Sequence, residues 1–107
     1  MKIRMSPNVA VRHKQFSAAM DFYSGVLGFE NRSSDPELGD FAAGPINLFV
    51  LADQELSGPV MELFVEDLDE ARKYLEANGC KVLRWRGKGQ DCYIQDPFGV
   101  IYNIWEE

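Results

Sequence analysis

The chain has 107 residues, a hydrophobic fraction of 46% and a formal net charge of −6 at pH 7. Its length fits one domain, residues 1–107, with a core of its own. The acidic charge argues against nucleic acid as a partner, because phosphate binding needs a clustered basic surface. No apolar run approaches the ~20 residues that span a bilayer, so we also expect no membrane partner.

The first half of the chain, about residues 1–52, has the pattern β-α-β-β-β. A short β-prone segment at 8–13 precedes apolar residues at helical spacing, which are Phe16, Ala19, Met20, Tyr23 and Leu27. Gly28 is a plausible residue to end this helix. Further strands are predicted at 29–33, 41–43 and 46–51, with a turn at 33–39.

The second half, about residues 59–107, repeats this pattern after a linker at 53–59 that is too short to separate independent domains. A strand is predicted at 60–65. Asp67 is a natural N-cap for the next helix, and Gly79 ends it. The predicted buried stripe of this helix consists of Leu68, Ala71, Tyr74 and Leu75. Three more strands are predicted at 81–86, 91–95 and 100–105.

The two halves are also similar in sequence. Phe16 pairs with Leu68, Ala19 with Ala71, Phe22 with Tyr74 and Tyr23 with Leu75, all at an offset of 52 residues. Such a repeat predicts two copies of one supersecondary unit. By helical spacing, we expect Phe22 and Tyr23 to be core residues that pack their helix onto the sheet.

The start of the chain favours a cytoplasmic protein, and in the cytoplasm its two cysteines remain thiols. MKIRMSPNVAV has no long apolar stretch of the kind found in a signal peptide. Cys80 and Cys92 match no metal-binding spacing, and we interpret them as free thiols in strands.

Three segments carry a resemblance to a known superfamily. They are AMDFYSGVLGFE (19–30), VEDLDEARKYLEANG (65–79) and DPFGVIYNIWE (96–106). They resemble the vicinal oxygen chelate superfamily, which contains glyoxalase I, extradiol dioxygenases, fosfomycin-resistance enzymes and bleomycin-resistance proteins. The resemblance implies an α+β fold of two βαβββ modules, with mixed sheets that form a cup-shaped half barrel. It also implies a bacterial protein that forms a homodimer.

Metal-dependent members of that superfamily hold their ion with ligands from four strands. The matching positions here are Asn8, Val60, Asn103 and a residue near Leu48. First-row divalent ions are bound by imidazole, carboxylate or thiolate, and amides and apolar groups do not replace these. The resemblance therefore implies no metal and no cofactor in this chain. His13, the only histidine, faces opposite to Asn8 by strand alternation, and we expect a surface or packing role for it.

Strand alternation predicts which side chains line the cavity. The predicted ligand-binding residues are Asn8, Arg12, Phe49, Glu62, Phe64, Tyr93, Asn103 and Trp105. A few polar groups in an apolar wall are typical of a small-molecule site. Plain packing is the alternative for Phe64 and Trp105, and an ion pair with each other is the alternative for Arg12 and Glu62. A buried Asn103 would have to bond either backbone or ligand.

Three functions follow from these observations. The favoured one is a protein that binds a small organic molecule, cationic or aromatic, in a metal-free cup and so sequesters a drug or metabolite. The second is a lyase, isomerase or dioxygenase of the glyoxalase type with a non-standard active site, in which Glu62 would be the general base. The third is a structural module whose cup is filled by its own side chains.

Overall fold

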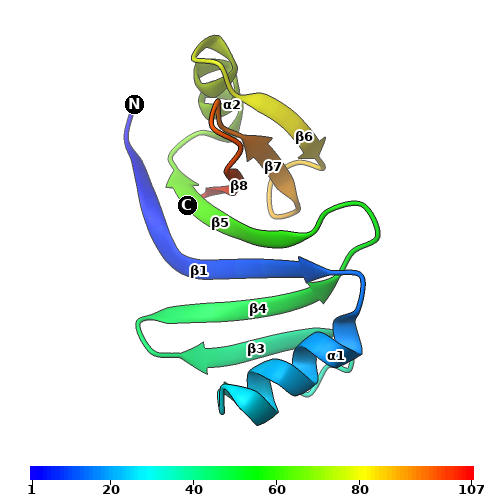
Figure 1. Ribbon diagram of the computed structural model, residues 1–107. Helices are drawn as coiled ribbons and strands as arrows, with labels where there is room; N and C mark the ends of the chain where they lie inside the picture. Colours follow the sequence, from blue (N-terminus) through cyan, green and yellow to red (C-terminus); the bar gives the residue numbers. More distant parts are fainter. The chain divides into compact units, whose positions relative to one another are not determined.

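The computed structural model describes all 107 residues, and the chain divides into two compact units. One unit is Pro7–Pro59, which we call module one. The other consists of Met1–Ser6 and Val60–Glu107, which we call module two. Each module has a mixed four-stranded sheet, and Figure 1 shows the helices α1 and α2 that belong to them.

Module one has the predicted β-α-β-β-β order. Its elements are β1 (Ile3–His13), α1 (Phe16–Asp21), the π-helix η1 (Phe22–Val26), β2 (Glu30–Asn31), β3 (Leu38–Ala43) and β4 (Ile46–Ala52). The strands lie in the order β2-β3-β4-β1, with β1 parallel to β4 and the other neighbours antiparallel. The part of β1 that pairs with β4 runs from Asn8 to His13, which is the range predicted from the sequence.

Module two repeats this arrangement. Its elements are β5 (Gly58–Val65), α2 (Leu68–Ala77), β6 (Lys81–Trp85), β7 (Cys92–Gln95) and β8 (Ile101–Glu106). The strands lie in the order β5-β8-β7-β6, and β5 is parallel to β8. In both modules the first strand therefore pairs with the fourth, the fourth with the third and the third with the second. The α+β fold of two βαβββ modules is confirmed, while the cup-shaped half barrel stays a prediction.

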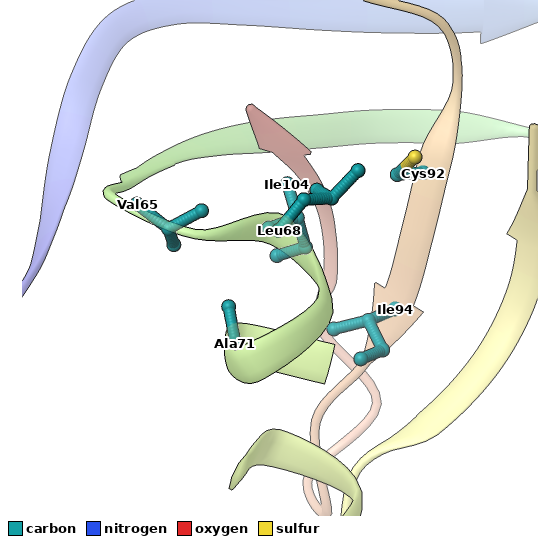
Figure 2. Packing of buried hydrophobic residues seen from close by; sticks show 6 residues of the cluster. All are labelled: Val65, Leu68, Ala71, Cys92, Ile94 and Ile104. Carbon is teal, nitrogen blue, oxygen red and sulfur yellow. The ribbon is translucent and has the colours of Figure 1, made fainter. Parts of the chain in front are cut away.

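Each module buries one face of its sheet under its own helix. In module one the fully buried apolar residues come from β1, β3 and β4, and they are Val11, Phe41, Leu48 and Val50. Met20 of α1 and Tyr23 of η1 pack against them. Figure 2 shows the corresponding cluster of module two, which consists of Val65, Leu68, Ala71, Cys92, Ile94 and Ile104.

Hydrogen bonds at both ends of α2 explain where this helix begins and ends. The Asp67 carboxylate accepts a hydrogen bond from the Glu70 amide (2.9 Å), as predicted for an N-cap. Glu106 of β8 accepts the Leu68 amide (3.0 Å), which satisfies a second free donor of the first turn. At the other end Gly79 has φ +93°, and the Cys80 amide donates to the Leu75 carbonyl (3.0 Å). This is the hydrogen bond of a Schellman motif, so the predicted helix end is confirmed.

Three residues predicted in the buried stripes are largely exposed: Phe22 (48%), Leu27 (47%) and Tyr74 (50%). Leu27 departs because the backbone widens into a π-helix before it, whereas Phe22, like its repeat counterpart Tyr74, lies outside the stripe at 100° per residue. The Leu27 amide bonds the Phe22 carbonyl (3.1 Å), one residue further back than in an α-helix, which rotates the following side chains off the stripe. Tyr74 lies about 90° around α2 from the centre of its stripe, at 100° per residue.

Several strand boundaries differ from the prediction, and β1 begins at Ile3 rather than at residue 8. β2 has only two residues, where a strand over 29–33 was predicted, and β3 begins at Leu38 rather than at residue 41. None of the helices α1, η1 and α2 is long and apolar enough to cross a membrane.

Candidate functional site

Each sheet has a second face that its helix does not cover, which we call the helix-free face. On β1, Val9 and Val11 pack with the helix of module one, so alternation turns Asn8 and Arg12 to the helix-free face. Phe49 lies on this face too, because it pairs in register with Ala10. The same reasoning places Leu48, which is buried with Val11, on the helix side.

A polar network crosses the helix-free face of module one. The Asn47 amide nitrogen donates to the Asn8 Oδ1 atom (2.9 Å) from the adjacent strand. Arg32 then donates through Nη2 both to Asn47 Oδ1 (3.0 Å) and to Asp40 Oδ1 (2.7 Å). Ala42 is the register neighbour of Asn47 on β3, and its small side chain leaves room for Arg32 to reach across. The network fixes the orientation of the Asn47 amide, because its oxygen and its nitrogen have different partners.

Arg12 is buried (8% exposed) at the end of β1. Its Nη1 atom lies 3.8 Å from Oδ2 of Asp53, which is also buried. The other Asp53 oxygen accepts the backbone amides of Glu55 and Leu56, both at 2.9 Å. A buried guanidinium is tolerated only with a partner charge, so this pair is a fixed part of module one. From the sequence, Asp53 was predicted only as the first residue of the linker at 53–59.

The helix-free face of module two carries the other five predicted residues. Glu62 pairs in register with Asn103, and Phe64 with Trp105. Tyr93 is the neighbour of Asn103 on the other side. The structure therefore places the predicted residues in two groups: Asn8, Arg12 and Phe49 in module one, and Glu62, Phe64, Tyr93, Asn103 and Trp105 in module two.

Asn103 is half-buried, and its Oδ1 atom accepts the Cys92 amide (3.0 Å). Of the two alternatives for this side chain, the hydrogen bond to backbone is the one the structure shows. The amide oxygen of Asn103 therefore already has a structural role, as an acceptor for the backbone of β7.

Two aromatic rings on the helix-free face of module two already have a guanidinium beside them. Arg4 lies over the Phe64 ring at 4.7 Å, and Arg84 over the Tyr93 ring at 5.4 Å. Arg84 also lies 3.4 Å from Asp91. The Arg4 contact was not predicted, because β1 extends to Ile3 and brings Arg4 to β5, beyond the strand expected at 8–13. The Arg84 contact comes from the pairing of β6 with β7.

His13, the only histidine, takes a packing role at the end of β1. Its Nε2 atom lies 3.0 Å from the Tyr23 hydroxyl, and the two ring centroids are 6.0 Å apart. Tyr23 in turn contacts the buried ring of Phe41 edge-on at 5.9 Å. His13 therefore joins the first strand to the helix of module one.

The chain belongs to the Glyoxalase/Bleomycin resistance protein/Dioxygenase superfamily, whose family model matches residues 7–104. No curated protein sequence matches the chain. Among solved structures, it is similar to a member of this superfamily from Vibrio splendidus, with 15% identity, a TM-score of 0.67, and coverage of 99% of this chain and 100% of that one. A hypothetical protein from Bacillus halodurans gives 15% identity, a TM-score of 0.64, and coverage of 100% and 96%.

An extradiol enzyme is also among the structural neighbours. Homoprotocatechuate 2,3-dioxygenase from Brevibacterium fuscum, in complex with 3,4-dihydroxyphenylacetate, has 22% identity and a TM-score of 0.64. The match covers 97% of this chain and 36% of the dioxygenase, so this chain spans about a third of that enzyme. At these identities the likeness shows the shared fold.

Strand register refines the four positions where the resemblance places metal ligands. On β4, Asn47 is the neighbour of Asn8 on the helix-free face, whereas Leu48 faces the helix. On β5, Glu62 is the neighbour of Asn103, whereas Val60 is buried. By the offset of 52 residues Asn8 corresponds to Val60, so the Glu62 carboxylate lies two residues beyond the position that matches Asn8.

These residues do not fit a divalent ion. Only Glu62 is a carboxylate, and the other three positions hold amides, which are weak ligands for first-row metals. The oxygens of Asn8, Asn47 and Asn103 already accept hydrogen bonds from protein groups. No group of three or more His, Cys, Asp or Glu side chains lies close enough together to hold a metal ion.

Proposed function

We propose that this protein binds a small organic molecule on the helix-free faces of its sheets without a metal ion. By this proposal it acts in the cytoplasm as a homodimer and sequesters a drug or a metabolite. Membership of the superfamily supports the general class, because its description includes bleomycin-resistance proteins. The absence of a metal rests on the chemistry of the side chains at the ligand positions.

One observation carries the proposal: the amide pair Asn8–Asn47 occupies the place where two metal ligands are expected. The pair is tied by a 2.9 Å hydrogen bond and held from the other side by Arg32. A site that binds an ion leaves its ligand oxygens free for it, whereas these oxygens have protein donors. Such an arrangement suits recognition by hydrogen bonds and shape.

The aromatic side chains favour a ring-containing guest over a cationic one. Phe64 and Tyr93 already have guanidinium groups over their rings, so those faces offer little to a second cation. Trp105 is partly exposed beside Phe64 and carries no such cation. Offset or edge contacts with a ligand ring are the interactions left to these side chains.

A ligand screen by thermal unfolding tests the proposal. The protein is heated with aromatic compounds, including 3,4-dihydroxyphenylacetate, the ligand of the dioxygenase neighbour. A ligand at a hundred times its Kd adds about 2.7 kcal/mol to the free energy of unfolding, which is a readily measured rise in Tm.

Variants then locate the binding. Glu62→Gln is expected to weaken any hit, because it removes the one carboxylate among the four positions. Glu70→Gln, on the exposed side of α2, is the control and should bind as the parent does. The proposal fails if no compound raises Tm, or if a hit binds only after zinc, iron or manganese is added.

A further inference from the structure

Module two contains a hollow at the end of its sheet, which shares only Phe64 with the predicted binding residues. The start of β1 passes the end of β5 and the last residue of the chain there (Figure 1). The volume is about 330 Å³, at the lower end of the range for small-molecule sites. The lining residues are Met1, Lys2, Ile3, Arg4, Phe64, Val65, Glu66 and Glu107, all of module two.

The apolar part of the lining is fixed by the fold. Val65 belongs to the buried core under α2, and Ile3 packs against that core. Phe64 is held on the adjacent β5 strand, in register with Trp105. The hollow therefore has an apolar wall with one aromatic ring, which suits a small apolar or aromatic group.

Arg4 is held in place beside this wall. Its guanidinium lies 4.7 Å from the centre of the Phe64 ring, and its Nη2 atom donates to a carboxylate oxygen of Glu107. A guanidinium has five N–H donors, so the Nε and Nη1 atoms remain available to a ligand. Because the stacking and the ion pair already restrict the side chain, less entropy is lost when a carboxylate binds.

Charges of both signs border the hollow without partners of their own. Neither Lys2 nor Glu66 makes a hydrogen bond or an ion pair. An anion alone would face Glu66 and Glu107, and a cation alone would face Lys2 and Arg4. A zwitterion meets both requirements, because its anionic group can approach the two cations while its cationic group approaches Glu66.

We propose that this hollow binds an apolar α-amino acid. The α-carboxylate would bind Arg4 and Lys2, the α-ammonium would bind Glu66, and the side chain would pack against the Phe64 ring. This goes beyond the proposed function, because it concerns a second site that holds a different class of ligand.

Three probes that share one ring separate the contributions. They are L-phenylalanine, 3-phenylpropionate, which lacks the ammonium, and 2-phenylethylamine, which lacks the carboxylate. By isothermal titration, L-phenylalanine should bind about tenfold or more tightly than either of the others, since hydrogen bonds to charged groups are among the stronger ones. Equal or tighter binding of either half-molecule would overturn the proposal, as would no binding of L-phenylalanine at all.

The chain supplies a matched control for Arg4. Arg72 also lies over an aromatic ring, Trp85 at 4.9 Å, and pairs with Glu76 at 2.9 Å, but it does not line this hollow. Arg4→Gln should weaken L-phenylalanine binding about tenfold, while Arg72→Gln leaves it unchanged. Equal losses in both variants would show that the effect comes from general stability, and the assignment of the site would be wrong.

Glu66→Gln gives an independent readout. This variant should lose the preference for L-phenylalanine over 3-phenylpropionate, because only the amino acid carries the ammonium that Glu66 would bind. In two-dimensional NMR spectra, the amide signals that move on titration should belong to residues 2–4, 64–66 and 107. A preference that survives Glu66→Gln, or movement confined to other residues, would contradict the proposal.

Discussion

A single aspartate, Asp96, organises the turn between β7 and β8. Its Oδ1 atom accepts the amides of Phe98 and Val100, both at 2.9 Å, and its Oδ2 atom accepts the Tyr102 hydroxyl at 3.0 Å. Desolvation alone would raise the pKa of Asp96, but the hydrogen bonds together lower it below its ordinary value. The pKa of Tyr102 is raised, first by desolvation and then by its bond to Asp96. The charged carboxylate is therefore a structural part of this turn.

The lowered pKa of Asp96 predicts a loss of stability in acid. A carboxyl group whose pKa is lower in the folded state stabilises the fold above its unfolded pKa, and this contribution disappears as the pH falls through the folded pKa. Asp96→Asn should thus be less stable than the parent at neutral pH, and the two should converge below about pH 4. Urea unfolding across this pH range measures the difference, with Asp21→Asn as an exposed control. A difference that does not change with pH would contradict the account.

The candidate site residues show how far single residues could be predicted. Asn103 was expected to bond either backbone or ligand, and the Cys92 amide is the partner observed. The partners of Arg12 and Asn8 could not be predicted, since Asp53 and Asn47 reach them only through the pairing of β1 with β4. Strand alternation gives the face of a side chain, whereas its partner depends on register.

At the scale of elements, the end of α2 depends on one glycine. Gly79 has φ +93°, a conformation that costs other residues roughly 1–2 kcal/mol. A Cβ atom there would also lie 3.1 Å from Cγ of Pro97. Gly79→Ala should therefore lower the free energy of unfolding by about 1–2 kcal/mol or more.

Gly25 in η1 is the control for this substitution. Its φ is not positive, and no atom lies within 4 Å of the Cβ position. Gly25→Ala should be neutral or stabilise the protein by up to about 1 kcal/mol, because alanine restricts the unfolded chain. Chemical unfolding of both variants tests the pair, and the reasoning fails if Gly25→Ala is the more damaging change.

The elements themselves were largely predictable because their signals are local. The N-cap Asp67, the stop at Gly79 and the apolar runs of the strands each act within a few residues. The π-helix η1 was not predictable, since its wider turn leaves no pattern in the sequence and shifts Leu27 off the stripe. The segment Ile3–Pro7 was missed because a charged residue, a serine and a proline make a poor strand signal.

At the scale of the whole molecule, the repeat in the sequence predicted the repeat in the fold. The offset of 52 residues between the two helices corresponds to two sheets with the same strand order. A supersecondary unit that recurs in one chain constrains topology strongly, because each copy must pair its strands in the same way. The ligand could not be predicted in this way, since it depends on a few side chains that the repeat does not share.

We further expect a homodimer, as the resemblance to the superfamily implies. Three large apolar side chains, Phe22, Val26 and Leu27, are exposed within one short segment of the single chain. Light scattering coupled to gel filtration should give a mass near twice 12.2 kDa. A mass of one chain at every concentration would contradict this expectation.

The metal content of the purified protein tests the central claim most directly. The protein is prepared without chelator and analysed by mass spectrometry for zinc, iron, manganese and nickel, and each ion is then added back while Tm is followed. We predict far less than one ion per chain and no rise in Tm, because Asn8, Asn47 and Asn103 offer amide oxygens that already accept hydrogen bonds. About one tightly bound ion per chain, with a Tm that falls when the ion is removed, would contradict the account.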